Sequence, residues 1–471
     1  MTGRMTFLWT SLLAAVLTLG TGPSAVRQTT AAAAEMPSFK LDASWPKPLP
    51  NSWILGQIAG IAVDADDNIW VLQRARSLSV LEAFATDAFD DAGNPIVDSD
   101  GKPVNELGHP RPAGALSGCC APAPAVMKFD PAGNLLQAWG GPADPGYLGP
   151  HERGKPGCDP NPPERCQWPG EEHGILIDHN GFVYIAGNGA KGDGKLGGKP
   201  ARWAATHGPD SQVLKFSQDG TFLLQIGEAG QASAISNDTG TSANGTPRLW
   251  RPADMEVDPE TNELYIADGY GNHRIVVVDA VTGEYKRHWG AYGQNPVDDE
   301  AAEASGPYAK DRDAGAKPGN FRNPVHCVRL AKDGLVYVCD RPNDRVQVFD
   351  KNEVGRPCNN PGREVGKCGF VGERFIRADT LGPGTVFDAD LSVDAAQSCL
   401  FNVDGSNGLI DTLDRLKLEL LASFGGFGRA AGSFNILHNF VVDSQGNIYT
   451  AEVIEGKRAQ KFRIEGPKHC G

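Results

Sequence analysis

HGILIDHNGFVYIAG, residues 173–187, contains two apolar stretches joined by an Asp/Asn/Gly turn, a pattern that predicts a β-hairpin. The pattern recurs, and its clear copies are GIAVDADDNIWVLQ from Gly60, ADMEVDPETNELYIADG from Ala253, HCVRLAKDGLVYVCD from His326 and HNFVVDSQGNIYTAE from His438. A sixth, degenerate copy starts at Phe387. Most copies are followed by a third strand, such as IVVVD from Ile275, and several by a fourth, such as YKRHWG from Tyr285. Four short strands repeated about six times predict an all-β, six-bladed β-propeller.

The N-terminal segment is expected to close this ring. The last copy lacks a clear fourth strand after Phe462, whereas the strand-like segment FKLDASW, residues 39–45, has no copy of its own. Pairing the two removes two sheet edges at once. We therefore expect one propeller domain over residues 35–471. Its long Pro/Gly/Asp-rich loop insertions span residues 84–116, 141–170, 230–247 and 292–319.

Residues 1–34 have the order of a secretory signal peptide and a short leader. Arg4 precedes an apolar stretch over residues 7–19, and small and polar residues follow from Pro23. The apolar stretch is shorter than the roughly 20 residues of a membrane helix, and no later segment approaches that length. The sequence thus predicts an exported protein, secreted or periplasmic, without a membrane span.

Composition limits the partners and favours disulfides. The net charge of −14 argues against binding to nucleic acid or anionic membranes, since both favour basic patches. A small-molecule or peptide substrate remains, and we expect a monomer. Ten cysteines in an exported chain indicate disulfides. The pairs that close short Pro/Gly-rich loops are Cys158–Cys166 and Cys358–Cys368. Cys119 and Cys120 are adjacent and form either one vicinal disulfide or two separate bridges.

Three histidines share one position in the repeat. Each lies eight residues before the turn glycine, and they are His173, His326 and His438 in the second, fourth and sixth copies. First strands of a propeller line its channel, and alternate blades of six are about 120° apart, so the three side chains should converge. Ala59 and Ala253 leave room between them. Three imidazoles with an open fourth position are a ligand set of catalytic zinc, whereas calcium prefers oxygen. The alternative is that each histidine is only a polar channel residue.

The segment DGYGNHRIVVVD from Asp268 resembles the NHL repeat signature. Together with the histidines, it makes the chain similar to peptidyl-α-hydroxyglycine α-amidating lyase, a six-bladed zinc propeller. That resemblance implies cleavage of the N–Cα bond of a hydroxylated glycine amide, giving an amide and glyoxylate. It also implies zinc at the three histidines, a catalytic tyrosine at Tyr270 in ADGYGN, and active-site arginines at Arg74 in WVLQRA and Arg341 in VCDRPNDR.

The residue types suit these implied roles. Arg74 and Arg341 each lie four residues after the aromatic residue of a second strand, where the chain leaves the sheet. A tyrosine beside Arg⁺ and Zn²⁺ can take the hydroxyl proton, and an arginine fork suits a terminal carboxylate. The competing interpretation of each is ordinary: turn tyrosines usually pack, and loop arginines are usually solvated.

The chain also departs from the family. Asn439 stands where the family's structural calcium takes an aspartate, and an amide oxygen ligates calcium more weakly. Ile436 replaces a methionine of the substrate pocket, and Gly271 replaces a cysteine that follows the tyrosine. The zinc ligands are thus retained, while the choice of substrate is open to change.

Two other functions fit the sequence. The first is a non-catalytic exported NHL propeller that binds a protein, peptide or glycan through its loops, for which Tyr270 and Arg74 should point away from the histidines. The second is a calcium-dependent hydrolase of the lactonase type, which needs Asp, Glu and Asn on the axis. The histidine register favours the zinc lyase over both.

Overall fold

The computed structural model describes residues 36–78, 120–141, 167–189, 209–298, 319–356 and 369–470, without 379 and 381. It also describes a few isolated positions between 82 and 101 and between 195 and 200. The predicted signal peptide, Cys119 and the pairs Cys158–Cys166 and Cys358–Cys368 lie outside these residues. No helix among the described residues is long and apolar enough to cross a membrane.

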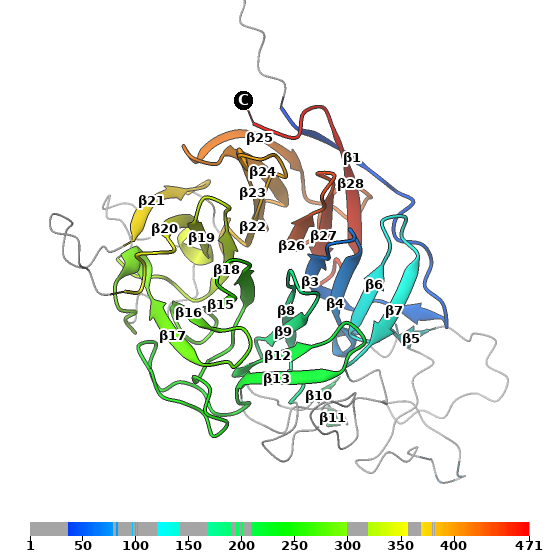
Figure 1. Cartoon of the computed structure of the whole chain (residues 1–471). Helices are drawn as coiled ribbons and strands as arrows, with labels where there is room; N and C mark the ends of the chain where they lie inside the picture. The colour runs from blue at the N-terminus through cyan, green and yellow to red at the C-terminus, as the bar shows by residue number, and fades with distance from the viewer. Residues whose placement is uncertain are drawn as a thin grey trace, which may run out of the picture. The chain divides into compact units, whose positions relative to one another are not determined.

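Six four-stranded antiparallel sheets form the blades of a propeller (Figure 1). Blade 1 contains β3 (Gln57–Val63), β4 (Ile69–Arg74), β6 (Val126–Phe129) and β7 (Leu135–Trp139). Blade 2 contains β8 (Glu172–Ile177), β9 (Val183–Gly187), β12 (Gln212–Phe216) and β13 (Phe222–Gly227). Blade 3 contains β14 (Asp254–Asp258), β15 (Glu263–Asp268), β16 (Arg274–Asp279) and β17 (Tyr285–Trp289).

The second half of the chain repeats this plan. Blade 4 contains β18 (Val325–Leu330), β19 (Leu335–Asp340), β20 (Arg345–Asp350) and β21 (Phe370–Phe375). Blade 5 contains β22 (Asp388–Leu391), β23 (Cys399–Asp404), β24 (Leu409–Asp414) and β25 (Glu419–Gly425). Blade 6 contains β26 (Leu437–Val442), β27 (Ile448–Glu452), β28 (Ala459–Glu465) and β1 (Ser38–Leu41). Shorter elements are β2 (Trp53–Ile54), β5 (Ala121–Pro122), β10 (Lys195–Leu196), β11 (Lys199–Pro200), η1 (Ala75–Ser77), η3 (Ala291–Gly293) and η4 (Arg341–Asn343).

An aspartate fixes the first hairpin of several blades. In blade 2, Asp178 accepts hydrogen bonds from the backbone N–H groups of Asn180 and Phe182, at 2.9 and 2.8 Å. Its second carboxylate oxygen accepts the hydroxyl of Tyr184 on the next strand, at 3.3 Å. Blades 1 and 6 repeat the arrangement at Asp64 and Asp443. The Asp/Gly/Asn turn of the repeat is therefore a hydrogen-bonded turn that also anchors the buried aromatic residue.

The N-terminal strand closes the ring, as predicted. Strand β1 pairs antiparallel with β28, from Ser38 opposite Glu465 to Leu41 opposite Phe462. The paired segment is shorter than residues 39–45, because the chain turns after Leu41. Trp45 then packs edge-on against Phe129 of blade 1 and Tyr449 of blade 6. The segment thus fills the seam between the first and last blades as well as completing a sheet.

The innermost strands contact one another in the order β3, β8, β14, β18, β22, β26, and β26 returns to β3. Figure 1 shows these strands around the centre of the ring. Two disulfides lie among the described residues, one joining Cys327 of β18 to Cys339 of β19, the two inner strands of blade 4, and the other joining Cys399 of β23 to Cys470. The ring places the beginnings of β8, β18 and β26 on the channel at alternate blades.

Candidate metal centre

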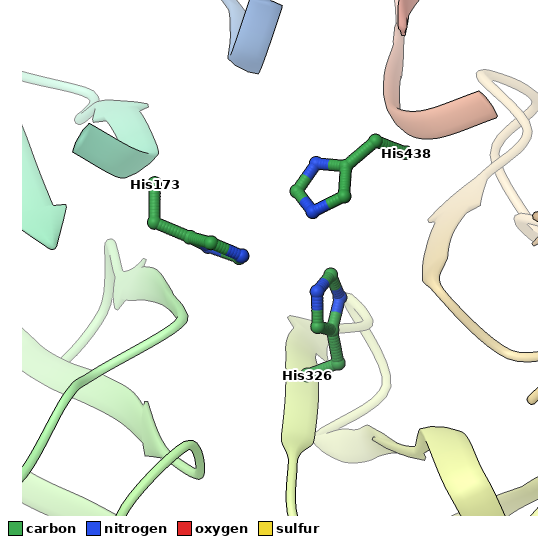
Figure 2. Close-up of side chains that lie close together, drawn as sticks. All are labelled: His173, His326 and His438. Carbon is green, nitrogen blue, oxygen red and sulfur yellow. The ribbon is translucent and has the colours of Figure 1, made fainter. Parts of the chain in front are cut away.

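The structure brings the three register histidines together at the centre of the ring. His173 comes from β8, His326 from β18 and His438 from β26. Figure 2 shows their imidazoles pointing toward one another. One ring nitrogen from each lies within 4.8 Å of the other two, and the ring centroids are 4.8 to 4.9 Å apart. All three side chains are buried, so the group can hold a metal ion.

Backbone carbonyls fix the tautomer of each histidine. Nδ1 of His173 lies 2.8 Å from the oxygen of Ala253, and Nδ1 of His438 lies 2.8 Å from that of Ala59. Nδ1 of His326 lies 2.5 Å from the oxygen of Phe387. Because a carbonyl only accepts, each Nδ1 carries the hydrogen and each Nε2 keeps its lone pair. This orientation through the second nitrogen is the usual one for metal-binding histidine.

Burial keeps these imidazoles neutral. It lowers the pKa of His173 and His326 well below the usual value for histidine, and it lowers the pKa of His438 to about 3. For His173 and His326, neighbouring histidines and arginines add to this effect, and Arg74 and Arg341 do so for His438. Three neutral imidazole nitrogens directed at one another favour a bound cation.

A β-bulge aims each histidine at the axis. The pairing of the first two strands shifts register between Glu172 and Ile175 in blade 2, between Val325 and Cys327 in blade 4, and between Leu437 and Asn439 in blade 6. Each shift coincides with the histidine, and bulges re-aim side chains in this way. In blade 2, a side chain at Gly174 would come within 2.5 Å of the Ala253 carbonyl oxygen, which accepts the hydrogen bond from Nδ1 of His173. Glycine therefore permits the close approach of blades 2 and 3.

Tyr270 faces two of the histidines. Its hydroxyl lies 3.0 Å from Nε2 of His173 and 3.0 Å from Nε2 of His326. Arg341, in η4 directly after β19, donates from Nη1 to the same hydroxyl at 3.1 Å. Gly269 makes this position possible, because a side chain there would come within 1.8 Å of the oxygen of Val325. Tyr270 and Arg341, which the resemblance implied as site residues, therefore lie beside the histidines.

Arg74 is also near the site, but protein groups occupy its donors. It ends β4, and its Nε donates to the Glu172 carbonyl at 2.6 Å. Nη1 donates to Gln57 at 3.1 Å and forms an ion pair with Glu171 at 2.9 Å. Nη2 donates to Asn188 at 3.2 Å. In this arrangement Arg74 holds the backbone just before His173 and joins blade 1 to blade 2.

Arg251 lies beside the site and was not predicted from the sequence. Its guanidinium carbon lies 5.4 Å from the centre of the Tyr270 ring, and its Nη1 donates to the Tyr270 carbonyl at 3.2 Å. The available signal was its place in the repeat, since it stands two residues before Ala253, the blade 3 equivalent of the histidines. Gly271 replaces a cysteine of the family that the chain resembles. In the structure, the ring of Trp250 fills the space that a side chain at Gly271 would need.

The amide group of Asn439 is hydrogen-bonded to protein groups in this structure. Its amide oxygen accepts the N–H of Ile61 at 2.9 Å, and its amide nitrogen donates to Asp388 at 2.5 Å. The cation next to this cluster is the guanidinium of Arg329, which bonds Asp388 at 2.8 Å and also bonds Asp254. An arginine thus bridges blades 3 and 5 beside Asn439, and calcium binding at this residue stays a prediction.

Comparisons with known proteins agree with the repeat and with the resemblance. The NHL repeat family matches residues 249–278 and 324–349. Peptidyl-glycine alpha-amidating monooxygenase B of Xenopus laevis is 31% identical over 178 residues, which cover 38% of this chain and 15% of that protein. Peptidyl-glycine alpha-amidating monooxygenase of Mus musculus is 27% identical over 199 residues, which cover 41% of this chain and 15% of that protein.

NHL repeat-containing protein 3 of Homo sapiens is 30% identical over 142 residues, which cover 30% of this chain and 31% of that protein. The chain is therefore a six-bladed propeller that contains NHL repeats and is homologous, at modest identity, to peptidylglycine alpha-amidating monooxygenase. This homology and the described disulfides are consistent with an extracellular protein.

Proposed function

We propose that the protein is a zinc-dependent lyase that cleaves the N–Cα bond of a hydroxylated glycine amide to give an amide and glyoxylate. One observation carries the proposal: the Tyr270 hydroxyl lies 3.0 Å from Nε2 of both His173 and His326 and 3.1 Å from Nη1 of Arg341. An acid–base group, unprotonated imidazole nitrogens and a guanidinium thus meet at the hub. The homology to amidating monooxygenase supports the same class of reaction.

The chain's own residues account for the proton transfers. Zinc held by His173, His326 and His438 would supply a Lewis acid that polarises the substrate hydroxyl. Tyr270 takes the hydroxyl proton while the carbinol carbon becomes the aldehyde of glyoxylate and the N–Cα bonding pair leaves with the amide nitrogen. Tyr270 then returns the proton to that nitrogen, so the reaction balances without water. Arg341 stabilises the tyrosinate while the proton is absent.

The alternatives have less support. A propeller that only binds a partner has no need for Tyr270 to face the histidines, yet its hydroxyl contacts two of them. A calcium hydrolase of the lactonase type needs carboxylates at the hub, where this chain has imidazoles. Imidazole also suits copper, iron and nickel, so the choice of zinc rests on the three-histidine set with an open position, which is typical of catalytic zinc.

Metal analysis followed by an activity assay tests the proposal. We expect about one equivalent of zinc in the purified protein and release of glyoxylate from α-hydroxyhippurate. Chelation should abolish both, and added zinc should restore both. A His438→Ala variant should lose metal and activity together. The control is His288→Ala in β17 of blade 3, which removes only a contact with Asn237 outside the metal centre, and this variant should keep both metal and activity. Folded protein that neither retains nor binds added zinc, or that releases no glyoxylate when zinc-loaded, would refute the proposal.

A further inference from the structure

The two arginines beside Tyr270 have no carboxylate partner at ion-pair distance, although Glu171 and Asp210 act favourably on the charge of Arg251 from farther away. No described Asp or Glu oxygen lies within 4.0 Å of the guanidinium of Arg251 or Arg341, whereas such a partner is present for Arg274, Arg287, Arg329 and Arg345. The Nε of Arg341 is also buried without a hydrogen-bond partner. Two arginines therefore leave positive charge at the site, which favours an anionic ligand.

Arg251 is the arginine with donors to spare. Its Nε donates to the Asn188 carbonyl at 2.6 Å and its Nη1 to the Tyr270 carbonyl at 3.2 Å, which holds the group in place through neutral acceptors. No described residue accepts a hydrogen bond from its Nη2. Arg341, in contrast, is directed at the Tyr270 hydroxyl and lies over the ring of Phe387 at 4.6 Å. Nη2 of Arg251 is therefore the nitrogen that remains open, and a charged N–H donor of this kind suits a carboxylate oxygen.

The backbone is strained to present this side chain. Arg251 adopts a left-handed conformation with φ of 57°, which is costly for a residue other than glycine. Hydrogen bonds on both sides hold it, from its own N–H to the Asp210 carbonyl at 2.7 Å and from the Tyr270 N–H to its carbonyl at 3.2 Å. Ile436 has the same conformation, with φ of 56°, two residues before His438. The same left-handed turn thus occurs two residues before the register position in blades 3 and 6.

We propose that Arg251, rather than Arg74, receives the carboxylate of the substrate. Arg74 is already paired with Glu171 and hydrogen-bonded at Nε, Nη1 and Nη2, so a ligand would have to displace protein contacts to use it. Arg251 needs no such displacement. The inference rests on the proposed function and specifies how its substrate is oriented, with the carboxylate of the hydroxylated carbon directed toward blade 3, because Tyr270 and Arg251 both come from that blade.

Binding of an unreactive pair of ligands tests this assignment without turnover. Hippurate has the glycine carboxylate but no hydroxyl. Hippuramide has the same skeleton, with an uncharged amide in place of the carboxylate. Calorimetry of the zinc-loaded protein should show that Arg251→Met weakens hippurate about 10- to 100-fold, the usual loss for one charged hydrogen bond. Hippuramide should change less than about twofold. Arg248→Met, which removes a neighbouring arginine that pairs with Asp238, is the matched control and should change neither.

Three results would overturn the assignment. In the first, hippurate does not bind the unmodified protein. In the second, Arg251→Met binds hippurate with unchanged affinity. In the third, Arg251→Met weakens the binding of hippurate and hippuramide equally. The last indicates a structural role. Arg74→Met should instead lower the melting temperature while leaving the preference for hippurate over hippuramide intact. If hippurate binds through Arg251 but α-hydroxyhippurate is not cleaved, the proposed reaction fails and the carboxylate site stands. If Arg251→Met cleaves α-hydroxyhippurate with an unchanged KM, the reaction stands and the carboxylate site fails.

Discussion

Replacing Tyr270 with phenylalanine separates acid–base chemistry from metal binding. The change removes one oxygen that contacts His173, His326 and Arg341 and leaves the ring in place. Loss of a positioned acid–base group lowers kcat about 10²- to 10⁴-fold. The Nδ1 contacts that orient the histidines do not involve Tyr270, so zinc content should stay near one equivalent.

The same substitution should lower the stability of the fold only slightly. Without the hydroxyl, Nη1 of Arg341 joins its Nε in lacking a partner, which costs about 1–3 kcal/mol for a buried group and less here because the residue is half-buried. Tyr292→Phe is the matched control, since that hydroxyl also accepts a hydrogen bond from an arginine, Arg345, at 2.9 Å, outside the metal centre. Glyoxylate release should be measured on zinc-loaded variants. If Tyr270→Phe retains more than a tenth of the unmodified kcat, the role given to Tyr270 is wrong.

Three further predictions concern the metal and the channel. His326→Ala should bind less than a tenth of an equivalent of zinc and lose the stabilisation that zinc gives, about 2.7 kcal/mol at 100 times Kd, when melting is compared with and without metal. In metal-free protein, His438 has a pKa of about 3 when folded, so the unfolded state alone takes up its proton below about pH 6.5. The free energy of unfolding should therefore fall by about 1.4 kcal/mol per pH unit from this group as pH drops from 6.5, and urea titrations of His438→Gln should show a shallower slope. Arg329→Met should lower the free energy of unfolding by about 3–5 kcal/mol, because Asp254 and Asp388 lose their buried cation. Since Arg329 already neutralises these carboxylates, calcium added to the unmodified protein should leave its melting temperature unchanged.

Periodicity in the sequence was enough to predict the ring and the convergence of the histidines. Both follow from repeats of fixed length, because equivalent positions of a propeller lie at one height. The bulges at His173, His326 and His438 were not predictable, since a single inserted residue does not alter the apolar pattern enough to be recognised. The pairing of Arg74 with Glu171 depends on contacts between blades, and repeats within a blade carry no information about these. Arg251 was missed because its one signal, a place two residues before the register position of blade 3, does not show that its backbone turns left-handed there.

The pairing of β1 with β28 joins the first described strand of the chain to the last in one sheet. That sheet also contains β26, which carries His438. Synthesis of the chain therefore leaves the metal site with two of its three imidazoles until the final blade is made, and that blade is incomplete until the two ends of the domain meet. Contacts of such long sequence separation form late and slowly in folding. Metal uptake should accordingly report the completion of the whole domain, and a nascent or truncated chain would be unable to hold the ion prematurely.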